Sequence, residues 1–88
     1  MWMVCNVMTR WKIKFHGIED VKTFVSIVSK VDAEFDLSSL YGRYSVDAKS
    51  ILGVCSLDLS KKLDLRIYTD DDDIINSLKS QLKEYIVE

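Results

Sequence analysis

The chain has 88 residues, of which 12 are basic, 14 are acidic and 48% are hydrophobic. This length allows one domain with one core, and the composition is that of a globular protein rather than a disordered chain. A formal net charge of -2 argues against a surface built for nucleic acid or for anionic lipid.

The cysteine and histidine content argues against a metal site. Cys5 and Cys55 lie far apart in the sequence, and His16 is the only histidine. These residues do not form the closely spaced ligand pairs of a structural zinc site. We therefore expect free thiols, as in a reducing cytosol, with no bound metal and no cofactor.

The first eight residues are apolar but do not form a targeting or membrane segment. They lack the charged start and the cleavage site of a signal peptide, and they are too short to span a bilayer. Met8 offers an alternative start, which would make residues 1–7 an extension. If the segment is native, it can pair as an edge strand with another chain. Both alternatives stay open, and the domain is predicted over residues 9–88.

The first two predicted elements are a strand and a helix. Residues 9–15 alternate polar and apolar, which is typical of a half-buried strand. After His16 and Gly17, apolar residues recur at three- and four-residue steps and predict a helix over 18–31. The apolar face of this helix comprises Ile18, Val21, Phe24, Val25, Val28 and Val31.

The middle of the chain predicts a hairpin, a short helix and a strand. Residues 33–37 and 40–46 are expected to pair through a turn at Ser38 and Ser39, and Gly42 marks a bulge or the turn itself. A helix is predicted at about 50–57, with Ser50 as its N-cap. Residues 62–68 alternate most clearly, with Leu63, Leu65 and Ile67 facing the core and Asp64, Arg66 and Tyr68 facing away.

A run of aspartates precedes the last predicted helix, at about 71–86. Asp70–Asp73 lack the alternating ligands, the glycine and the distal glutamate of a calcium loop. Acidic residues at a helix start stabilise the positive end of its dipole by about 0.3–1 kcal/mol each. The structural role is therefore favoured over metal binding.

The element order is β-α-β-β-α-β-α, which predicts an α+β fold with the helices packed on one face of the sheet. Three tyrosines are assigned to the open face of the sheet, and five other residues to the core. The tyrosines are Tyr41, Tyr44 and Tyr68, and the core residues are Trp11, Phe15, Phe24, Phe35 and Cys55.

At Val46–Val54, the segment VDAKSILGV is similar to the A-K-S-[ILM]-[MLF]-G pattern of the HPr family, the phosphocarrier proteins of the bacterial sugar phosphotransferase system. The element order over about residues 9–87 also resembles this family. The resemblance implies an HPr-like open-faced β-sandwich, with a four-stranded antiparallel sheet and three helices on one side. It also implies a bacterial cytoplasm, and a regulatory phosphorylation site at Ser50.

A second family motif is missing from its expected place. The phosphocarriers resemble G-[LIV]-H-[ST]-R-[PA] at the start of the first helix, where the histidine takes up the phosphoryl group. Here the corresponding segment is Gly17–Lys22, with sequence GIEDVK, and it holds neither the histidine nor the arginine. Glu19 and Asp20 place negative charge where a phosphoryl dianion would dock. The sequence therefore predicts that the carrier chemistry is lost.

Ser50 has two compatible interpretations, as a helix N-cap and as a phosphorylation site beside Lys49. The helix that follows holds more apolar residues than two turns can bury, and an exposed apolar patch favours a protein interface. In the HPr family this helix and the first one form the docking face for partners. The predicted partner-binding residues are Lys49, Ile51, Leu52 and Val54.

We therefore expect a non-catalytic regulatory or protein-binding module that acts as a monomer or weak homodimer. By resemblance, its partners are HPr kinase/phosphorylase or a transcriptional regulator, and neither nucleic acid nor a membrane. The alternatives are a divergent phosphocarrier that uses His16, and a small domain of unrelated function that keeps the fold.

Overall fold

The computed structural model of the chain describes residues 8–40 and 45–87. Within these ranges, strands and helices alternate in nearly the order that the sequence predicts. The elements are β1 (Met8–Ile13), α1 (Ile18–Ser29), β2 (Glu34–Ser39), β3 (Ser45–Asp47), α2 (Ile51–Cys55), β4 (Leu63–Tyr68), α3 (Asp72–Gln81) and β5 (Ile86–Val87). Some predictions concern residues outside these ranges. They are the two alternatives for residues 1–7 and the expectations for Tyr41, Gly42 and Tyr44.

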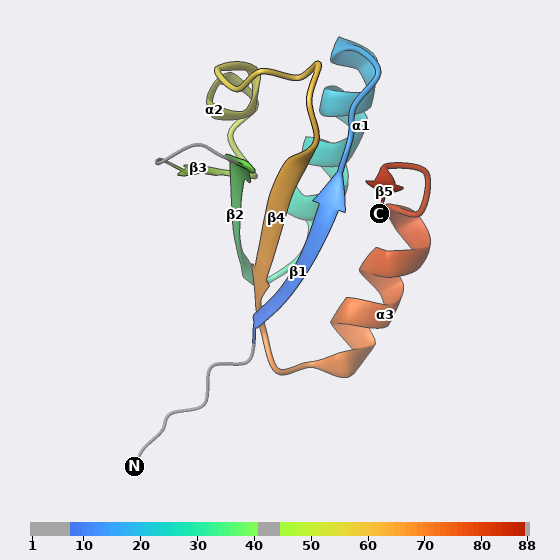
Figure 1. Cartoon of the computed structure of the whole chain (residues 1–88). Helices are drawn as coiled ribbons and strands as arrows, with labels where there is room; N and C mark the ends of the chain where they lie inside the picture. The colour runs from blue at the N-terminus through green and yellow to red at the C-terminus, as the bar shows by residue number, and fades with distance from the viewer. Residues whose placement is uncertain (1–7, 41–44, 88) are drawn as a thin grey trace.

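The strands form one antiparallel sheet in the order β3-β2-β4-β1-β5, with β4 at its centre (Figure 1). Helix α1 lies behind the sheet in this view, and residues of all three helices join one hydrophobic core. The α+β open-faced sandwich is therefore confirmed. The sheet has five strands rather than the four that the sequence predicts.

The core lies between the sheet and the helices. Apolar residues alternate along the strands and recur at three- and four-residue steps along the helices, so each element has one apolar face. Leu63, Leu65 and Ile67 of β4 are fully buried, as the alternation predicts. Phe15 packs edge to face against Phe24, with ring centroids 5.1 Å apart. The core assignment also holds for Phe35, whereas Trp11 is half-buried at the border of the core. The core prediction for Cys55 is wrong, because this residue is exposed.

The fifth strand comes from a segment that the sequence assigns to the last helix. The predicted helix over 71–86 ends at Gln81, and Leu82 forms its C-cap. Apolar residues continue at helical spacing beyond that point, but tertiary contacts decide their structure. The carbonyl of Tyr85 accepts a hydrogen bond from the Lys14 N–H at 2.9 Å, and Ile86–Val87 then pair with β1.

The predicted turn at Ser38 and Ser39 is wrong. Both residues belong to β2, where Ser38 pairs with Asp64 of β4 and with Ser45 of β3. Ser38 lies between two strands, and Ser39 pairs with Leu63 of β4. Their backbone groups thus find partners in the sheet, and this tertiary pairing outweighs the preference of serine for turns. The expected pairing of this strand with the next one is confirmed, through β2 and β3.

The aspartate run begins helix α3, as predicted. Asp71 is the N-cap, and its carboxylate accepts hydrogen bonds from the N–H groups of Asp73 and Ile74. Asp72 and Asp73 lie in the first turn. Among the described residues, no group of three or more histidine, cysteine, aspartate or glutamate side chains is placed to hold a metal ion.

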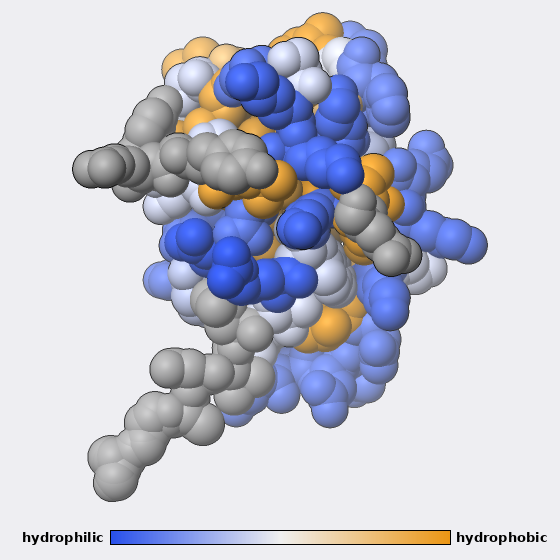
Figure 2. All heavy atoms as spheres, in the orientation of Figure 1, coloured by the Kyte–Doolittle hydropathy of each residue, from blue (hydrophilic) through white to orange (hydrophobic). Residues whose placement is uncertain are grey.

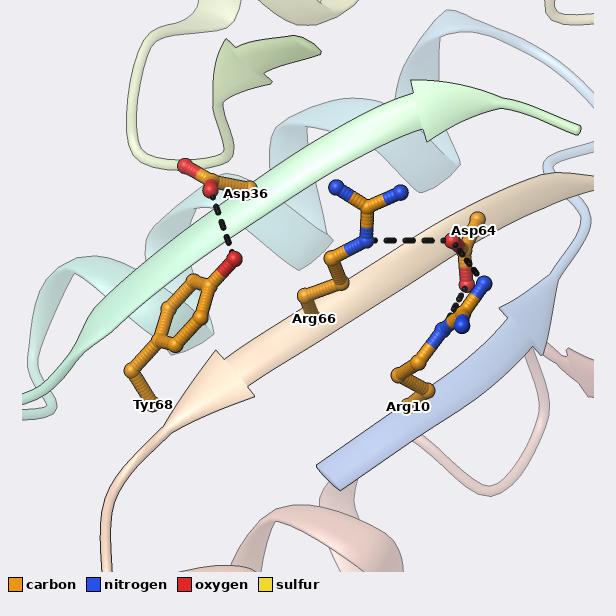
Figure 3. Close-up of polar contacts among 5 residues, drawn as sticks. All are labelled: Arg10, Asp36, Asp64, Arg66 and Tyr68. Atoms are coloured by element: carbon orange, nitrogen blue, oxygen red, sulfur yellow. Dashed lines mark hydrogen bonds and ion pairs between the residues drawn. The ribbon is translucent and has the colours of Figure 1, made fainter. Parts of the chain in front are cut away.

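The face of the sheet that lies opposite the core carries charged and polar side chains. Asp64 at its centre is only 5% exposed, and Arg10 and Arg66 both bind its carboxylate (Figure 3). The distances are 2.8 Å from Arg10 Nη2 and 3.2 Å from Arg66 Nε. Tyr68, which the sequence assigns to this face, donates a hydrogen bond from its hydroxyl to Asp36 at 3.0 Å. The carboxylate between them thus offsets part of the repulsion between two arginines that face each other across β1 and β4.

No helix within the described part of the chain is both long enough and apolar enough to cross a membrane.

The first testable prediction concerns Tyr85, which burial and the nearby charge of Asp20 give a raised pKa. A group with a raised folded-state pKa contributes stability below its unfolded value, about 10 for tyrosine, and loses it as the pH rises through the folded value. In Tyr85→Phe, the free energy of unfolding should therefore fall less steeply above about pH 10. Urea unfolding of both proteins at pH 7 and at several alkaline pH values measures this. Parallel losses in the two proteins would contradict the prediction.

Candidate functional site

The turn between β3 and α2 is held by backbone and side-chain hydrogen bonds. Asp47 accepts two of them, from the Lys49 N–H to its carboxylate and from the Ser50 N–H to its carbonyl, both at 2.9 Å. Ala48 is fully buried, and its N–H donates to the carbonyl of Phe35 at 3.3 Å. An aspartate that bonds the N–H two residues ahead is a standard way to fix a turn. Ser50 is thereby placed at a defined point in front of α2.

Ser50 is the N-cap of α2, as the sequence predicts. Its backbone is extended, with φ -99 and ψ 111, and its Oγ accepts a hydrogen bond from the Gly53 N–H at 3.2 Å. The carbonyl of Ser50 accepts the first helical hydrogen bond, from Val54 at 2.9 Å. The side chain is also exposed. One serine thus closes the helix and remains accessible from solvent.

Gly53 lets this cap close against β3. A Cβ at this position would lie 3.2 Å from the Cβ of Val46 and 3.3 Å from the Oγ of Ser50. Both distances are shorter than ordinary van der Waals contact between heavy atoms. The spacing of serine and glycine in the motif therefore has a packing reason, because a side chain on Gly53 would crowd the hydroxyl that caps the helix.

Apolar side chains are exposed on α2 and at the start of α1. Leu52 is 82% exposed, and Ile51 and Ile18 are also accessible to solvent. These three account for all but one of the large exposed hydrophobic residues in the described chain, the other being Tyr68. Figure 2 shows hydrophobic side chains at the top of the molecule, over α2 and near the start of α1, with hydrophilic side chains between them. We call Ile18, Ile51 and Leu52 the apolar docking surface.

Two residues predicted to contact a partner lie elsewhere. Val54 is fully buried and belongs to the core. The Nζ of Lys49 donates a hydrogen bond to the carbonyl of Val31 at 2.8 Å and lies 5.6 Å from the centre of the Phe35 ring. The ammonium group thus ties the turn to the segment between α1 and β2. It is already engaged by a carbonyl rather than directed at the hydroxyl of Ser50.

Ile18 is more exposed than its spacing in the sequence predicts. Its spacing puts it on the buried face of the predicted helix, but in the first turn it is 48% exposed. The sheet and helices bury the stripe from Val21 onward and leave the first residue of the helix uncovered. In the sequence, the only sign of this exposure is that Ile18 lies in the first turn of the helix, before the rest of its apolar face.

The phosphocarrier motif would lie at the start of α1, where the first helical turn is acidic. The ring of His16 is exposed, and its Nδ1 lies 3.5 Å from Oδ2 of Asp20. The same carboxylate oxygen accepts the backbone N–H of His16 at 2.9 Å. Glu19 adds a second carboxylate in the first turn of α1. Asp20 is therefore the carboxylate that contacts His16, while Glu19 pairs with Lys22 at 3.4 Å.

Comparison with known proteins identifies the class to which this fold and turn belong. The arrangement is a small open-faced α+β domain with a capping serine in front of its second helix. A family model described as the PTS HPr component phosphorylation site matches residues 20–85. The chain therefore belongs to the HPr family. This match begins after Gly17, Ile18 and Glu19, where the phosphocarrier histidine would be found.

Among solved structures, the chain is similar to a phosphocarrier protein HPr from Bacillus anthracis str. Ames. The TM-score is 0.64 at 18% sequence identity, over 86% of this chain and 98% of that one. At this identity the likeness shows the shared fold. A search of curated protein sequences finds no match.

The second testable prediction concerns the Ser50 cap. Ser50→Ala should lower the free energy of unfolding by about 1 kcal/mol, because the Gly53 N–H loses its acceptor. The free energy of unfolding of Ser50→Asp should stay within about a few tenths of a kcal/mol of the wild-type value, since aspartate caps a helix as well as serine does. Urea unfolding of both variants measures this. Ser80→Ala, on the exposed surface of α3, serves as the control, and equal stability of Ser50→Ala and that control would contradict the capping role.

Proposed function

We propose that this HPr-family protein is a non-catalytic regulatory module of the phosphotransferase system, and that phosphorylation of Ser50 controls its binding to other proteins. One observation carries the proposal: Ser50 is exposed and lies directly before the exposed Ile51 and Leu52. A phosphate on this accessible hydroxyl would place negative charge beside exposed apolar side chains. It would therefore change which proteins bind to this surface. The domain responsible is residues 9–88, without a cofactor and without metal.

A phosphate on Ser50 adds about -1.5 to -2 charges at pH 7. The nearest described lysine, Lys49, already donates its ammonium to the carbonyl of Val31, and Asp47 places a carboxylate in the same turn. The new charge would therefore be presented to a partner rather than neutralised within the domain. It would make the apolar docking surface unfavourable for an apolar or acidic partner, and favourable for one that brings arginine or lysine.

The contact surface of this proposal is Ile18, Ile51 and Leu52, with Ser50 beside them. Val54 is left out because it is fully buried. Lys49 holds the turn in place through Val31 and Phe35 and acts as a positioning residue. The proposed partners are HPr kinase/phosphorylase or a transcriptional regulator, in a bacterial cytoplasm, with this protein acting as a monomer or weak homodimer.

The loss of carrier activity is the second half of the proposal. The position of the phosphocarrier histidine is taken by Glu19, and the position of the arginine by Val21. Val21 is fully buried in the core, so an arginine there would have to leave the core to reach a phosphoryl group. Glu19 and Asp20 would repel the dianion. These features support a protein that binds partners without carrying phosphate on histidine.

The third testable prediction is phosphorylation of Ser50. Incubation with HPr kinase and ATP should label the wild-type protein, and Ser50→Ala should remain unlabelled. Leu52→Ser should lower kcat/KM for the kinase, mainly through KM, because it removes an apolar contact while Ser50 is intact. Asn76→Ser, on the exposed surface of α3, is the matched control and should be labelled like the wild type. Absence of label on Ser50 would remove the switch from the proposal.

The fourth testable prediction distinguishes the alternative, a divergent phosphocarrier that uses His16. With phosphoenolpyruvate and the first enzyme of the phosphotransferase system, the protein should acquire no acid-labile, alkali-stable phosphate. A functional phosphocarrier HPr in the same reaction is the positive control. Phosphate that appears on the wild type and is lost in His16→Ala would establish the alternative and contradict the loss of carrier activity.

A further inference from the structure

The face of the sheet opposite the core is open, and its charged side chains are sorted by sign. Figures 1 and 2 look onto this open face, because α1 lies behind the sheet in that view. Side chains alternate between the two faces along each strand, which assigns the charged residues of this face. Its basic residues come from β1 and β4, and they are Arg10, Lys12 and Arg66. Its acidic residues on β2 and β3 are Glu34, Asp36 and Asp47.

The strand register places four of these charges in one row across the sheet. Asp47 of β3 pairs with Asp36 of β2, and Asp36 pairs on its other side with Arg66 of β4. Arg66 pairs in turn with Arg10 of β1. This order places each charge next to a like charge, which costs stability. It also makes the row negative at the β3 end and positive at the β1 end.

The two end residues have partners within the domain, but they keep further binding capacity. Arg10 binds Asp64 through Nε at 3.4 Å and Nη2 at 2.8 Å, and its side chain is still 57% exposed. A guanidinium has five N–H donors, so Arg10 can bind a second carboxylate. Asp47 is exposed, and its Oδ1 accepts the Lys49 N–H at 2.9 Å. A carboxylate can accept several hydrogen bonds, so Asp47 can also bind an arginine.

The open face also carries an exposed aromatic side chain beside the charged row. Tyr68 is 40% exposed, and among the described residues it is the one large exposed hydrophobic side chain outside the apolar docking surface. Its hydroxyl donates a hydrogen bond to Asp36 at 3.0 Å, which holds the ring across the sheet (Figure 3). Tyrosine is enriched at protein interfaces, because it joins an apolar ring to a polar hydroxyl. The open face thus has an apolar contact as well as charge.

The charge pattern of this face is complementary to itself. A second copy turned by 180° about an axis along the strands places its β3 over β1 of the first copy. Asp47 of each copy then meets Arg10 of the other. An axis across the strands would instead place β3 over β3 and bring like charges together. Two-fold dimers in which both copies use the same surface are the commonest homo-oligomers, so a second copy is the partner that this pattern fits.

We propose that the open face of the sheet is a self-association surface, on which two copies pack face to face about a two-fold axis along the strands. Sheets packed in this way lie about 10 Å apart, a gap that an arginine and a carboxylate can bridge together. Polar interfaces below about 1,200 Å² are typical of transient complexes, so we expect a salt-sensitive dimer of low affinity. This surface is separate from Ser50 and the apolar docking surface, and it does not depend on the function proposed for them.

The first experiment is sedimentation equilibrium of the whole chain at several protein concentrations. The wild type should show a monomer–dimer equilibrium. Its Kd should rise at least about tenfold when sodium chloride is raised from about 50 to about 500 mM, because salt screens the pairs between arginine and carboxylate.

The double variant Glu34→Gln/Asp47→Asn tests the acidic half of the open face. It should raise Kd at least about tenfold, because each lost charge is missing twice in a symmetric dimer. Asparagine can still accept the Lys49 N–H, so the turn before α2 is kept. Asp73→Asn/Glu84→Gln changes the net charge equally at exposed positions in and after α3, and it should dimerise like the wild type.

If circular dichroism shows that this double variant is not folded, Glu34→Gln alone replaces it, with an expected rise in Kd of at least about threefold. Glu34 is exposed at the start of β2.

The second experiment tests the orientation of the two copies. Asp32→Cys in a Cys5→Ser/Cys55→Ser background carries a nitroxide at an exposed position just before β2. It is mixed with ¹⁵N-labelled wild type, so that only contacts between copies broaden the amide signals. The proposed axis places β2 of one copy over β4 of the other with the same ends together, so broadening should be strongest near Thr69. An axis across the strands would move it to the other end of the sheet, near Ser39.

Three results would overturn the proposal. One is a wild type that stays monomeric in low salt at every concentration up to its solubility limit. Another is an equal Kd for the two double variants, as expected if the copies met through the apolar docking surface. Broadening that is strongest near Ser39 would exclude the proposed axis and the pairing of Asp47 with Arg10.

Discussion

The central strand β4 is the constraint on which the rest of this structure depends. One face of it buries Leu63, Leu65 and Ile67 against the helices, and the other holds the Asp64 carboxylate between two arginines. A buried carboxylate is costly unless it is paired, so the ion pairs with Arg10 and Arg66 make this register of β1 against β4 favourable. A slip by one residue would move the apolar set to solvent and the carboxylate into the core.

The strands of the sheet also position the turns that precede α1 and α2. The residues that follow β1 lead into the turn at His16 and the start of α1, while β3 delivers the chain to the Ser50 turn. The HPr fold can therefore be retained while the chemistry of its turns changes, because the sheet is held by its own core and ion pairs. Here the first turn of α1 is acidic, and the start of α2 keeps the serine and the glycine that close the helix. The retained fold is therefore compatible with the loss of carrier chemistry that we propose.

The local features of the candidate site were predictable from sequence, and the surfaces were not. Ser50 as an N-cap and Asp71 in the same role follow from side chains that bond their own nearby backbone. The exposure of Ile18 and Cys55, the burial of Val54 and the engagement of Lys49 with Val31 depend on which neighbouring elements cover them. The five-residue helix α2 shows both cases, because one of its sides is buried and the other is exposed.

By itself, the sequence determined the α+β class, the order of the main elements, the apolar faces of the strands and the helix caps, because these depend on residues close together in the chain. The tertiary structure decided that Ser38 and Ser39 continue β2, that the last helix ends at Gln81 and that Ile86–Val87 form a fifth strand. Those outcomes rest on backbone hydrogen bonds to strands distant in sequence, which no local propensity encodes.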